Sequence, residues 1–167
     1  VNNVFRFLKN NYKTATYRHL LVSPFYMRKR IDKLIKDEIN NALAGKEAYM
    51  YIKLNSLVDR ATINRLYEAS QAGVKIKMIV RAICSLVPGI PGMSENIEII
   101  SIVDKYLEHS RILIFCNGGD EKYYITSADW MIRNLDNRVE VAAPIYDKNI
   151  QNELKNFLAI QFKDNVK

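Results

Sequence analysis

The chain contains few of the residues that bind structural metals or break regular structure. Its 167 residues include two cysteines, two histidines, six glycines and four prolines. Cys84 and Cys116 lie far apart and lack the close spacing of zinc ligands, so no structural zinc site is expected. Two free thiols fit a reducing compartment, and we expect both to be small apolar residues of the core.

Long apolar runs are also missing. No stretch approaches the ~20 apolar residues that a membrane helix needs, and no signal peptide opens the chain. The length suits one domain that buries roughly 70% of its unfolded surface. We therefore expect a single domain over residues 1–167, with 1–19 as a lead-in segment, in a cytoplasmic protein that is either free or peripheral to a membrane. Because the chain begins at Val1 instead of methionine, we expect a piece of a longer protein.

Positive charge is concentrated at the N-terminal end. The formal net charge is +7, and residues 1–36 carry nine Lys and Arg against the single acid Asp32. The remaining residues carry 16 basic and 17 acidic side chains. A basic end favours binding of a polyanion, but a solvated helix face that keeps the protein soluble explains the pattern equally well.

Hydrophobic periodicity predicts an α/β fold. Ser23 as N-cap and Pro24 at the first helical position predict a helix that ends at Gly45. The other expected elements are strands over 48–54, 74–80, 97–103 and 138–142, helices over 57–72 and 147–163, and a hairpin of 111–116 with 122–126. With a first strand entered at His19, the order is β-α-β-α-β followed by a hairpin, and it predicts a mixed, mostly parallel sheet flanked by helices.

The stretch from His109 to Glu140 gathers residues suited to phosphoryl chemistry. A histidine acts as nucleophile or general acid near neutral pH, and a guanidinium donates to two phosphate oxygens at once. A lone histidine near a strand start is more often structural, so the surrounding pattern matters. Further residues that could orient the imidazole or a phosphate lie in turns and at strand ends: Arg111, Ser127, Asp129, Arg133 and Glu140. Asp129 and Glu140 could equally be an ordinary turn cap or a salt-bridge partner.

Arg81 and Arg138 stand at strand boundaries. Ligands of open α/β sheets bind beyond the carboxyl ends of strands, so both side chains could reach a ligand. The alternative for each is a surface ion pair, which is usually weak. Asn55 lies in a loop and is a weaker candidate contact. His19 enters the first strand without phosphate-binding neighbours, and we do not expect a second catalytic histidine there.

The spacing after His109 resembles the phospholipase D signature, in which His-x-Lys is followed by Asp and by a Gly-Ser-x-Asn turn. In this chain Arg111 replaces the lysine, Cys116 replaces the aspartate, and Asp129 stands at the asparagine position. Longer segments resemble the C-terminal part of bacterial polyphosphate kinase, between about Val1 and Phe162: Leu20–Pro24, Lys53–Asp59, Leu66–Ser70, Ser101–His109 and Ser127–Met131. The fold implied is a phospholipase D-like half.

This resemblance implies an enzyme that reversibly transfers the terminal phosphate of ATP to inorganic polyphosphate. The phosphorylated histidine would belong to the preceding domain, and this chain alone would be inactive. His109 would face the transferred phosphate and assist the departing ADP, while Arg81 and Arg138 would contact nucleotide phosphates. The implied partners are ATP or ADP, polyphosphate, and the other domains of a homo-oligomeric parent, with Mg²⁺ held outside this chain and no nucleic acid.

Two other functions fit parts of the sequence. A phospholipase D-like phosphodiesterase or nuclease, working as a homodimer, would explain the histidine pattern, but the missing lysine, aspartate and asparagine count against it. A non-catalytic polyanion-binding module would explain the basic N-terminal end. Its affinity should fall steeply with salt and should not depend on His109.

Overall fold

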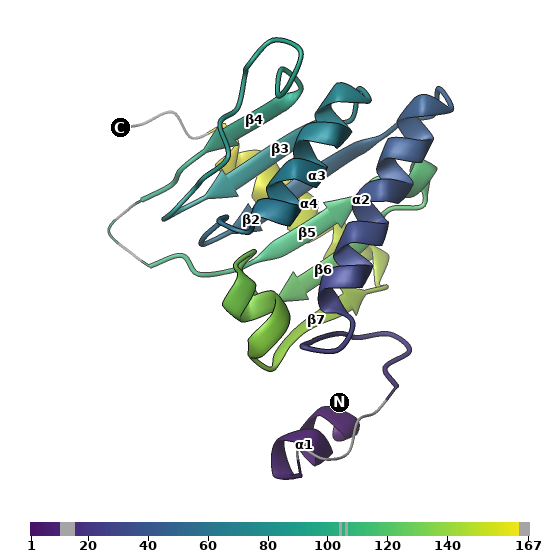
Figure 1. The fold of residues 1–167 in the computed structure, drawn as a ribbon, viewed down its shortest axis with the longest axis vertical. Helices are drawn as coiled ribbons and strands as arrows, with labels where there is room; N and C mark the ends of the chain where they lie inside the picture. Colours follow the sequence, from purple (N-terminus) through teal and green to yellow (C-terminus); the bar gives the residue numbers. More distant parts are fainter. Residues whose placement is uncertain (11–15, 104, 106, 164–167) are drawn as a thin grey trace.

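In the computed structural model, which describes residues 1–10, 16–103, 105 and 107–163, seven strands form one mixed sheet with helices on both faces (Figure 1). The strands are β1 (Leu21–Ser23), β2 (Tyr49–Leu54), β3 (Lys75–Val80), β4 (Ile97–Ile100), β5 (Ile112–Phe115), β6 (Lys122–Thr126) and β7 (Glu140–Ile145). The helices are α1 (Asn2–Lys9), α2 (Met27–Leu43), α3 (Arg60–Gln71) and α4 (Lys148–Gln161), with short turns η1 (Asn117–Gly119) and η2 (Arg133–Asn137). The strand order is β1-β7-β6-β5-β2-β3-β4.

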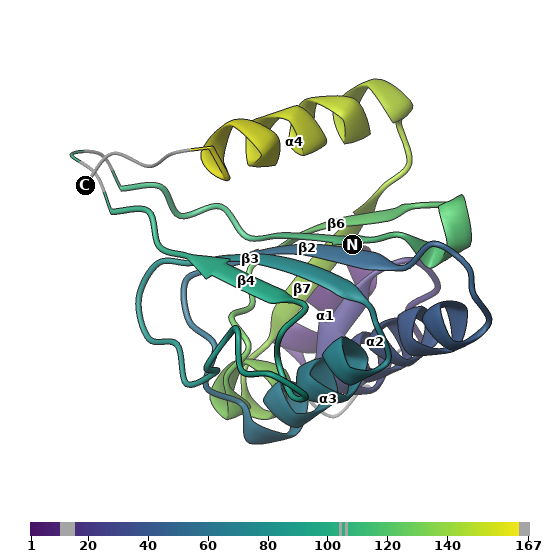
Figure 2. The same ribbon diagram turned by 90° about the horizontal axis from the view of Figure 1, so that it is seen from above.

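The helices form two layers around the sheet. Figure 2 shows α2 and α3 on one face and α4 alone on the other. Helix α1, within the expected lead-in segment, lies apart from these layers. Its residue Val4 packs with Tyr17 and Val22 in a small separate cluster at the β1 edge.

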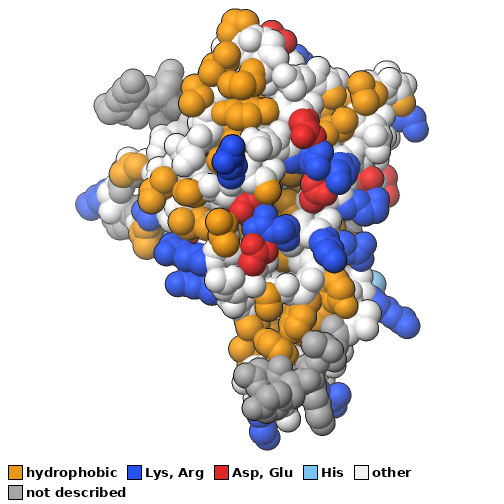
Figure 3. Space-filling model, viewed as in Figure 1, with side chains coloured by type: hydrophobic (Ala, Val, Ile, Leu, Met, Phe, Trp, Pro, Cys, Tyr) orange, Lys and Arg blue, Asp and Glu red, His pale blue; other side chains and the backbone are white. Residues whose placement is uncertain are grey.

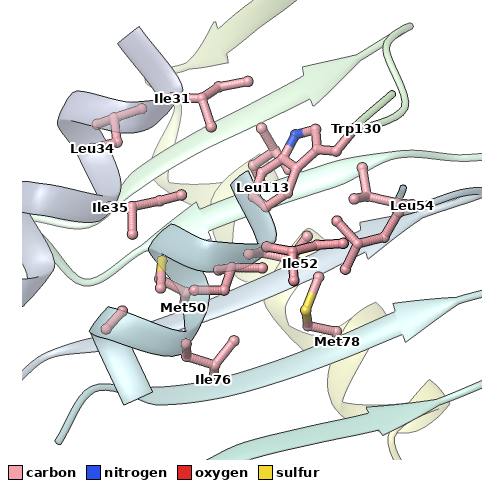
Figure 4. Packing of buried hydrophobic residues seen from close by; sticks show 14 of the residues in the cluster. Ile31, Leu34, Ile35, Met50, Ile52, Leu54, Ile76, Met78, Leu113 and Trp130 are labelled. Atoms are coloured by element: carbon pink, nitrogen blue, oxygen red, sulfur yellow. The ribbon is translucent and has the colours of Figure 1, made fainter. Parts of the chain in front are cut away.

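The main core lies between the sheet and the α2–α3 layer. Residues spaced three and four apart on α2 place Ile31, Leu34 and Ile35 against the sheet, as the helical period requires. Figure 4 shows these side chains facing the apolar side chains of β2, β3 and β5, with Trp130 closing one end. Trp130 is fully buried, so the segment after β6 is fixed by the core.

A second, smaller cluster lies under α4. Leu158 of this helix packs against Ile79, Ile112, Ile114 and Tyr123 on the opposite face of the sheet. The central strand β5 is therefore buried on both faces, which explains its continuous apolar run Ile112–Phe115. Both faces of the sheet are covered where the candidate site residues emerge.

Strand directions correct one part of the predicted topology. The mixed sheet and its flanking helices are confirmed, but among the described strands only β2–β3 and β3–β4 pair in parallel. The expectation of a mostly parallel sheet is therefore wrong. Strand β5 returns antiparallel to β2, the β5–β6 hairpin and β7 continue that pattern, and β1 joins the far edge against β7.

Three local predictions also need correction. The helix predicted to begin at Ser23 and Pro24 begins at Met27, because Ser23 belongs to β1 and pairs with Glu140. Strand β4 ends at Ile100, three residues before the predicted end. Cys116 is buried as expected, whereas Cys84 is exposed. In the part of the chain that the structure describes, no helix combines the length and apolar character needed to cross a bilayer.

Candidate functional site

The sheet topology brings His109 and Arg81 to the same edge. Strands β2 and β3 run in parallel and end together, and β5 begins beside the end of β2, where Lys53 lies opposite Ile112. Arg81 follows β3 directly, and the segment His109–Arg111 leads into β5. Arg81, His109 and Asn55 consequently line one shallow depression.

A chain of polar contacts fixes the imidazole of His109. Arg111 Nη2 lies 3.0 Å from His109 Nε2, and Arg111 Nη1 donates to the His109 carbonyl at 3.3 Å. A guanidinium has no acceptor, so Nε2 must accept this hydrogen bond. The proton of the neutral ring then resides on Nδ1, by assignment from the network. His109 itself is exposed, and its Nδ1 has no hydrogen-bond partner among the described residues.

Asp129 holds Arg111 in place. Its Oδ1 and Oδ2 accept from Arg111 Nε at 2.8 Å and Nη2 at 3.0 Å, and the two side chains are only 8% and 12% exposed. The same Oδ1 accepts from the backbone N–H groups of Asn55 at 2.8 Å and Ser56 at 3.0 Å. Burial acts to raise the pKa of Asp129, but the hydrogen bonds from Arg111 and Ser56 outweigh it and hold the pKa below its ordinary value. The carboxylate therefore stays charged and fastens the β6–η2 turn to the end of β2.

Arg81 is positioned by a different contact. Its Nε donates to Asn55 Oδ1 at 2.9 Å, which leaves the terminal nitrogens of the guanidinium without a side-chain partner among the described residues. The backbone carbonyl of Arg81 accepts from Ser101 Oγ at 3.2 Å. Asn55, predicted as a weaker contact, thus orients Arg81 with its side chain and binds Asp129 with its backbone.

Arg138 and Arg133 lie at the same edge but outside this depression. Arg138 ends the η2 turn just before β7, and its backbone N–H donates to the Arg133 carbonyl at 2.8 Å. Both side chains are exposed and have no hydrogen bond or ion pair with the residues described here. The structure therefore leaves both guanidiniums free to reach a ligand, but it does not bring either into contact with His109.

Ser127 and Glu140 form a separate pair beside the site. Ser127 Oγ donates to Glu140, and Glu140 also accepts from Asn134 Nδ2 at 2.7 Å. The Ser127 oxygen in turn accepts from the Val141 N–H at 3.1 Å. Glu140 therefore fastens the η2 turn to β7, whereas the guanidinium beside His109 is held by Asp129.

Sequence reasoning missed a buried lysine beneath the site. The side chain of Lys53 is 5% exposed and contacts Glu108, the residue before His109. Its Nζ also donates to Gln161 Oε1 of α4 at 2.9 Å and lies 4.7 Å from the ring centre of Phe157. The sequence offered one indication of this: Lys53 stands within the apolar run of β2, between two residues that are both buried.

Lys53 and Glu108 each stabilise the charged form of the other. Burial lowers the pKa of Lys53, and the contact with Glu108 opposes that shift. For Glu108, burial acts to raise the pKa, but the hydrogen bonds from Lys53 and Ser110 outweigh it and bring the pKa to about 2. Helix α4 thus reaches the loop of His109 through Gln161 and Lys53, which ties the position of the imidazole to the packing of the last helix.

The second histidine is remote from this edge. His19 precedes β1, and its Nδ1 lies 2.8 Å from the hydroxyl of Tyr146, beyond the end of β7. Strand β7 runs from Glu140 at the site edge to Ile145 at the opposite end. The structure therefore does not bring His19 to His109. Within the described residues, no group of three or more His, Cys, Asp or Glu side chains could hold a metal ion.

The arrangement at the site edge is suited to binding an oxyanion. An exposed imidazole is oriented by a buried ion pair, and a partly free guanidinium lies beside it. Imidazole N–H and guanidinium groups are strong donors to phosphate oxygens. Among the described residues, the two carboxylates beside the site, Asp129 and Glu108, are both engaged by cations and are not free to activate water.

Comparison with known proteins matches nearly the whole chain to one family. The family described as Polyphosphate kinase C-terminal domain 2 matches residues 20–167. A polyphosphate kinase from Vibrio vulnificus (strain YJ016) is 52% identical over 167 residues, which cover 100% of this chain and 24% of that protein. This chain therefore spans about a quarter of the length of the relatives that it matches.

Solved structures agree with that match. The crystal structure of polyphosphate kinase from Porphyromonas gingivalis has a TM-score of 0.94 and 48% identity, and covers 99% of this chain and 26% of that one. Nuc from Salmonella typhimurium, a phospholipase D family member, has a TM-score of 0.57 and 12% identity, with 84% of this chain and 90% of that one covered. The second likeness shows the fold alone, and it confirms a phospholipase D-like architecture.

Proposed function

Because this chain belongs to the polyphosphate kinase C-terminal domain family, we propose that it supplies part of an active site that transfers the γ-phosphate of ATP reversibly to inorganic polyphosphate. The observation that carries the proposal is the exposed imidazole of His109, oriented through Nε2 by Arg111 and lying beside Arg81 in one depression. The other domains of a parent about four times as long would complete the site. We also propose that the parent is a cytoplasmic homo-oligomer. Residues 1–167 would form one of its domains, with residues 1–19 as the lead-in segment.

The proposed reaction has two in-line steps. A histidine nitrogen of another domain attacks the γ-phosphorus of ATP, an N–P bond forms, and the bond between this phosphorus and the β–γ bridging oxygen breaks. The terminal oxygen of polyphosphate then attacks the same phosphorus, and the N–P bond breaks. Each step places negative charge on the non-bridging oxygens, where positioned cations give the largest stabilisation.

His109 and the two arginines divide this work in the proposal. Nδ1–H of His109 donates a hydrogen bond to the departing oxygen of ADP and stabilises the negative charge that develops there as the bond breaks. Arg81 and Arg138 neutralise charge on the non-bridging oxygens, because both have guanidinium nitrogens without side-chain partners in the described structure. Arg111 is already paired with Asp129, so its task is to hold the imidazole.

Magnesium enters the proposal only as a companion of ATP. The described residues offer no group of side chains that fits the ion, and we assign no ligand in this chain and derive no step through it. The proposal for residues of this chain therefore concerns the binding of phosphate oxygens and of the departing oxygen of ADP.

The experiment is phosphate transfer by the full-length protein that carries this chain. With γ-labelled ATP, Mg²⁺ and polyphosphate, label should pass to polyphosphate, and His109→Ala should abolish that transfer. Arg60→Ala removes an exposed cation on α3 and is the matched control that should retain activity. Equal activity in His109→Ala and in the control would overturn the role of His109.

The position of the covalent phosphate is a separate measurement. A digest of the labelled protein should contain phosphohistidine on a peptide outside this chain. Label on the peptide that contains Glu108, His109 and Ser110 would make His109 the nucleophile and reverse the assigned role. Hydrolysis of a phosphodiester without any transfer to polyphosphate would instead favour the phospholipase D-like alternative.

A further inference from the structure

A second basic cavity lies at the end of the sheet opposite His109. Its volume is ≈ 240 Å³, and it is enclosed by the lead-in to β1, helix α2, the start of β6 and the segment after β7. Strand β6 runs from Lys122 at this cavity to Thr126 near Arg111. Since a strand advances about 3.3 Å per residue, the four steps from Lys122 to Thr126 place these two ends of the sheet roughly 13 Å apart.

The cavity has an excess of unpaired positive charge. Four cations line it, and the one carboxylate among its lining residues, Asp37, is bound by Lys33 at 2.9 Å. The other three, Arg18, Arg30 and Lys122, make no hydrogen bond or ion pair with any side chain in the described part of the protein. Figure 3 shows Lys and Arg side chains gathered over α2 on the face of the molecule that is turned to the viewer.

The neighbouring cavity between α2 and α3 provides the contrast. Its Arg28 binds Asp59 at 2.8 Å and Asp136 at 2.6 Å, and its Arg65 binds Asp32 at 2.8 Å and also contacts Glu68. Lys29, which also lines that cavity, has no hydrogen bond or ion pair with a described side chain, so α2 presents one paired and one unpaired cation on each side: Arg28 and Lys29 toward α3, Lys33 and Arg30 toward β6. The two cavities differ because Arg18 and Lys122, which come from other elements, add two further unpaired cations on the β6 side.

Neutral hydrogen-bond donors complete the wall of the cavity. Tyr124 and Tyr146 line it, and the Tyr146 hydroxyl lies 2.8 Å from His19 Nδ1. Burial raises the pKa of Tyr124, Tyr146 raises it further and Arg30 acts in the opposite direction, so the phenol stays protonated at neutral pH. Several cations with phenol donors offer contacts to more oxygens than one carboxylate or one phosphate ion presents.

We infer that this cavity, with Arg18, Arg30 and Lys122 as its ligand-binding cations, is a second site that holds a linear condensed phosphate away from the transfer site. The choice of ligand rests on the proposed function, whereas the existence of an anion site rests on the charges alone. A phosphate chain held here would keep its free end near the first site at a high effective concentration. The site would then favour long acceptor chains over short ones.

The test measures tripolyphosphate binding to the full-length protein that carries this chain. Arg81→Ala and His109→Ala are introduced together to weaken the transfer site, and titration calorimetry is carried out at fixed salt. Adding Arg30→Gln and Lys122→Gln should raise the remaining Kd by about tenfold or more, because each removes a charge-assisted contact. The matched control adds Lys46→Gln and Arg60→Gln, which remove the same two charges from exposed positions outside the cavity.

Each outcome decides the inference. A loss confined to the Arg30 and Lys122 variant supports the site, provided that circular dichroism and the melting temperature match those of the control. Equal losses of tripolyphosphate affinity in both variants would show that binding depends on overall charge and would overturn the inferred site. An unchanged affinity in the Arg30 and Lys122 variant, or no binding before those substitutions, would also overturn it. Tighter binding of ATP that depends on the same two cations would make the cavity a nucleotide site and overturn the ligand assignment. Because no transfer is measured, a protein that binds tripolyphosphate here but makes no polyphosphate would refute only the proposed function.

Discussion

Asp129 binds Arg111 through two hydrogen bonds of 2.8 and 3.0 Å, and this ion pair holds the imidazole of His109 through a third contact of 3.0 Å. The aspartate stands where the phospholipase D signature has asparagine, and the arginine stands where it has lysine. The two departures are therefore coupled in space: a carboxylate neutralises the planar guanidinium that orients the histidine. A lysine at position 111 could not make both the paired contact to Asp129 and the contact to Nε2 with the same geometry.

Asp129→Ala should destabilise the protein strongly. The substitution leaves the guanidinium of Arg111 buried without its partner and removes the acceptor of two backbone N–H groups, so we expect a loss of about 3–5 kcal/mol in the free energy of unfolding. Urea unfolding followed by the fluorescence of Trp130 measures this change. Asp120→Ala, at an exposed position, should change the free energy of unfolding by less than about 0.5 kcal/mol. Equal effects of the two substitutions would contradict a structural role for the ion pair.

The phosphate-binding roles of Arg81 and Arg138 can be separated by substitution with lysine. Each alanine variant of the full-length protein should lose about 10²–10³-fold in kcat, as expected when a donor to a developing charge is removed. Arg138→Lys should restore activity only in part, because an ammonium cannot make a paired contact to two oxygens. Full activity of Arg138→Lys would show that charge alone is required at that position. Phosphate transfer at saturating ATP and polyphosphate is the measurement.

The sequence predicted the strands and helices that have strong periodicity. The hairpin and both main helix–strand units lie where the apolar pattern placed them, within a few residues. The start of α2 was misjudged because Ser23 and Pro24 have the composition of a helix start, whereas their location is decided by pairing of β1 with β7. Pairing between strands 117 positions apart is not encoded in any local pattern.

The candidate site was predictable to the same extent. His109, Arg81 and Asp129 were predicted because residue type and position relative to strand ends suggest phosphate chemistry. The topology brings His109 and Arg81 to one depression, and Asp129 is linked to it through Arg111 and Asn55. The role of Lys53 was not predicted, since only the three-dimensional packing of α4 against β2 shows that this lysine is buried beside Glu108. Likewise, nothing local distinguishes the engaged Glu140 from a carboxylate that faces a ligand.

Two aspartates that cap helices should differ in their effect on stability. Asp59 and Asp147 both accept N–H groups at the start of a helix, α3 and α4 respectively. Asp59 is buried and also binds Arg28 through two hydrogen bonds, whereas Asp147 is exposed. Asp147→Ala should cost about 1 kcal/mol, the usual value of a lost cap. Asp59→Ala should cost more, about 2–3 kcal/mol, because it also removes the acceptor of the Thr62 hydroxyl and one of the two carboxylates that bind Arg28. Matching losses in urea unfolding would show that Asp136 and solvent satisfy Arg28 without Asp59.

The Lys53–Glu108 pair should make stability depend on acid pH. The pKa of Glu108 is about 2 in the folded protein, below its ordinary value of 4.5, so the folded state binds this proton more weakly than the unfolded state. The stabilisation is therefore complete above pH 4.5 and is lost as the pH falls from 4.5 toward 2. Lys53→Met removes the cation and should raise the pKa of Glu108, so that the variant loses less stability than the wild type over this range.

The matched control for that prediction is another lysine–glutamate pair on the neighbouring strand. Lys77 Nζ lies 2.9 Å from Glu98, but these side chains are 45% and 53% exposed, against 5% for Lys53. Solvent screens such a pair, so Lys77→Met should leave the pH dependence of unfolding close to that of the wild type. Urea unfolding at intervals between pH 5 and pH 2.5 gives the three curves, and the other carboxylates contribute equally to all of them. If Lys53→Met and Lys77→Met give the same slope, burial of Lys53 adds nothing to its pairing with Glu108, and α4 does not fix the loop of His109 through this contact.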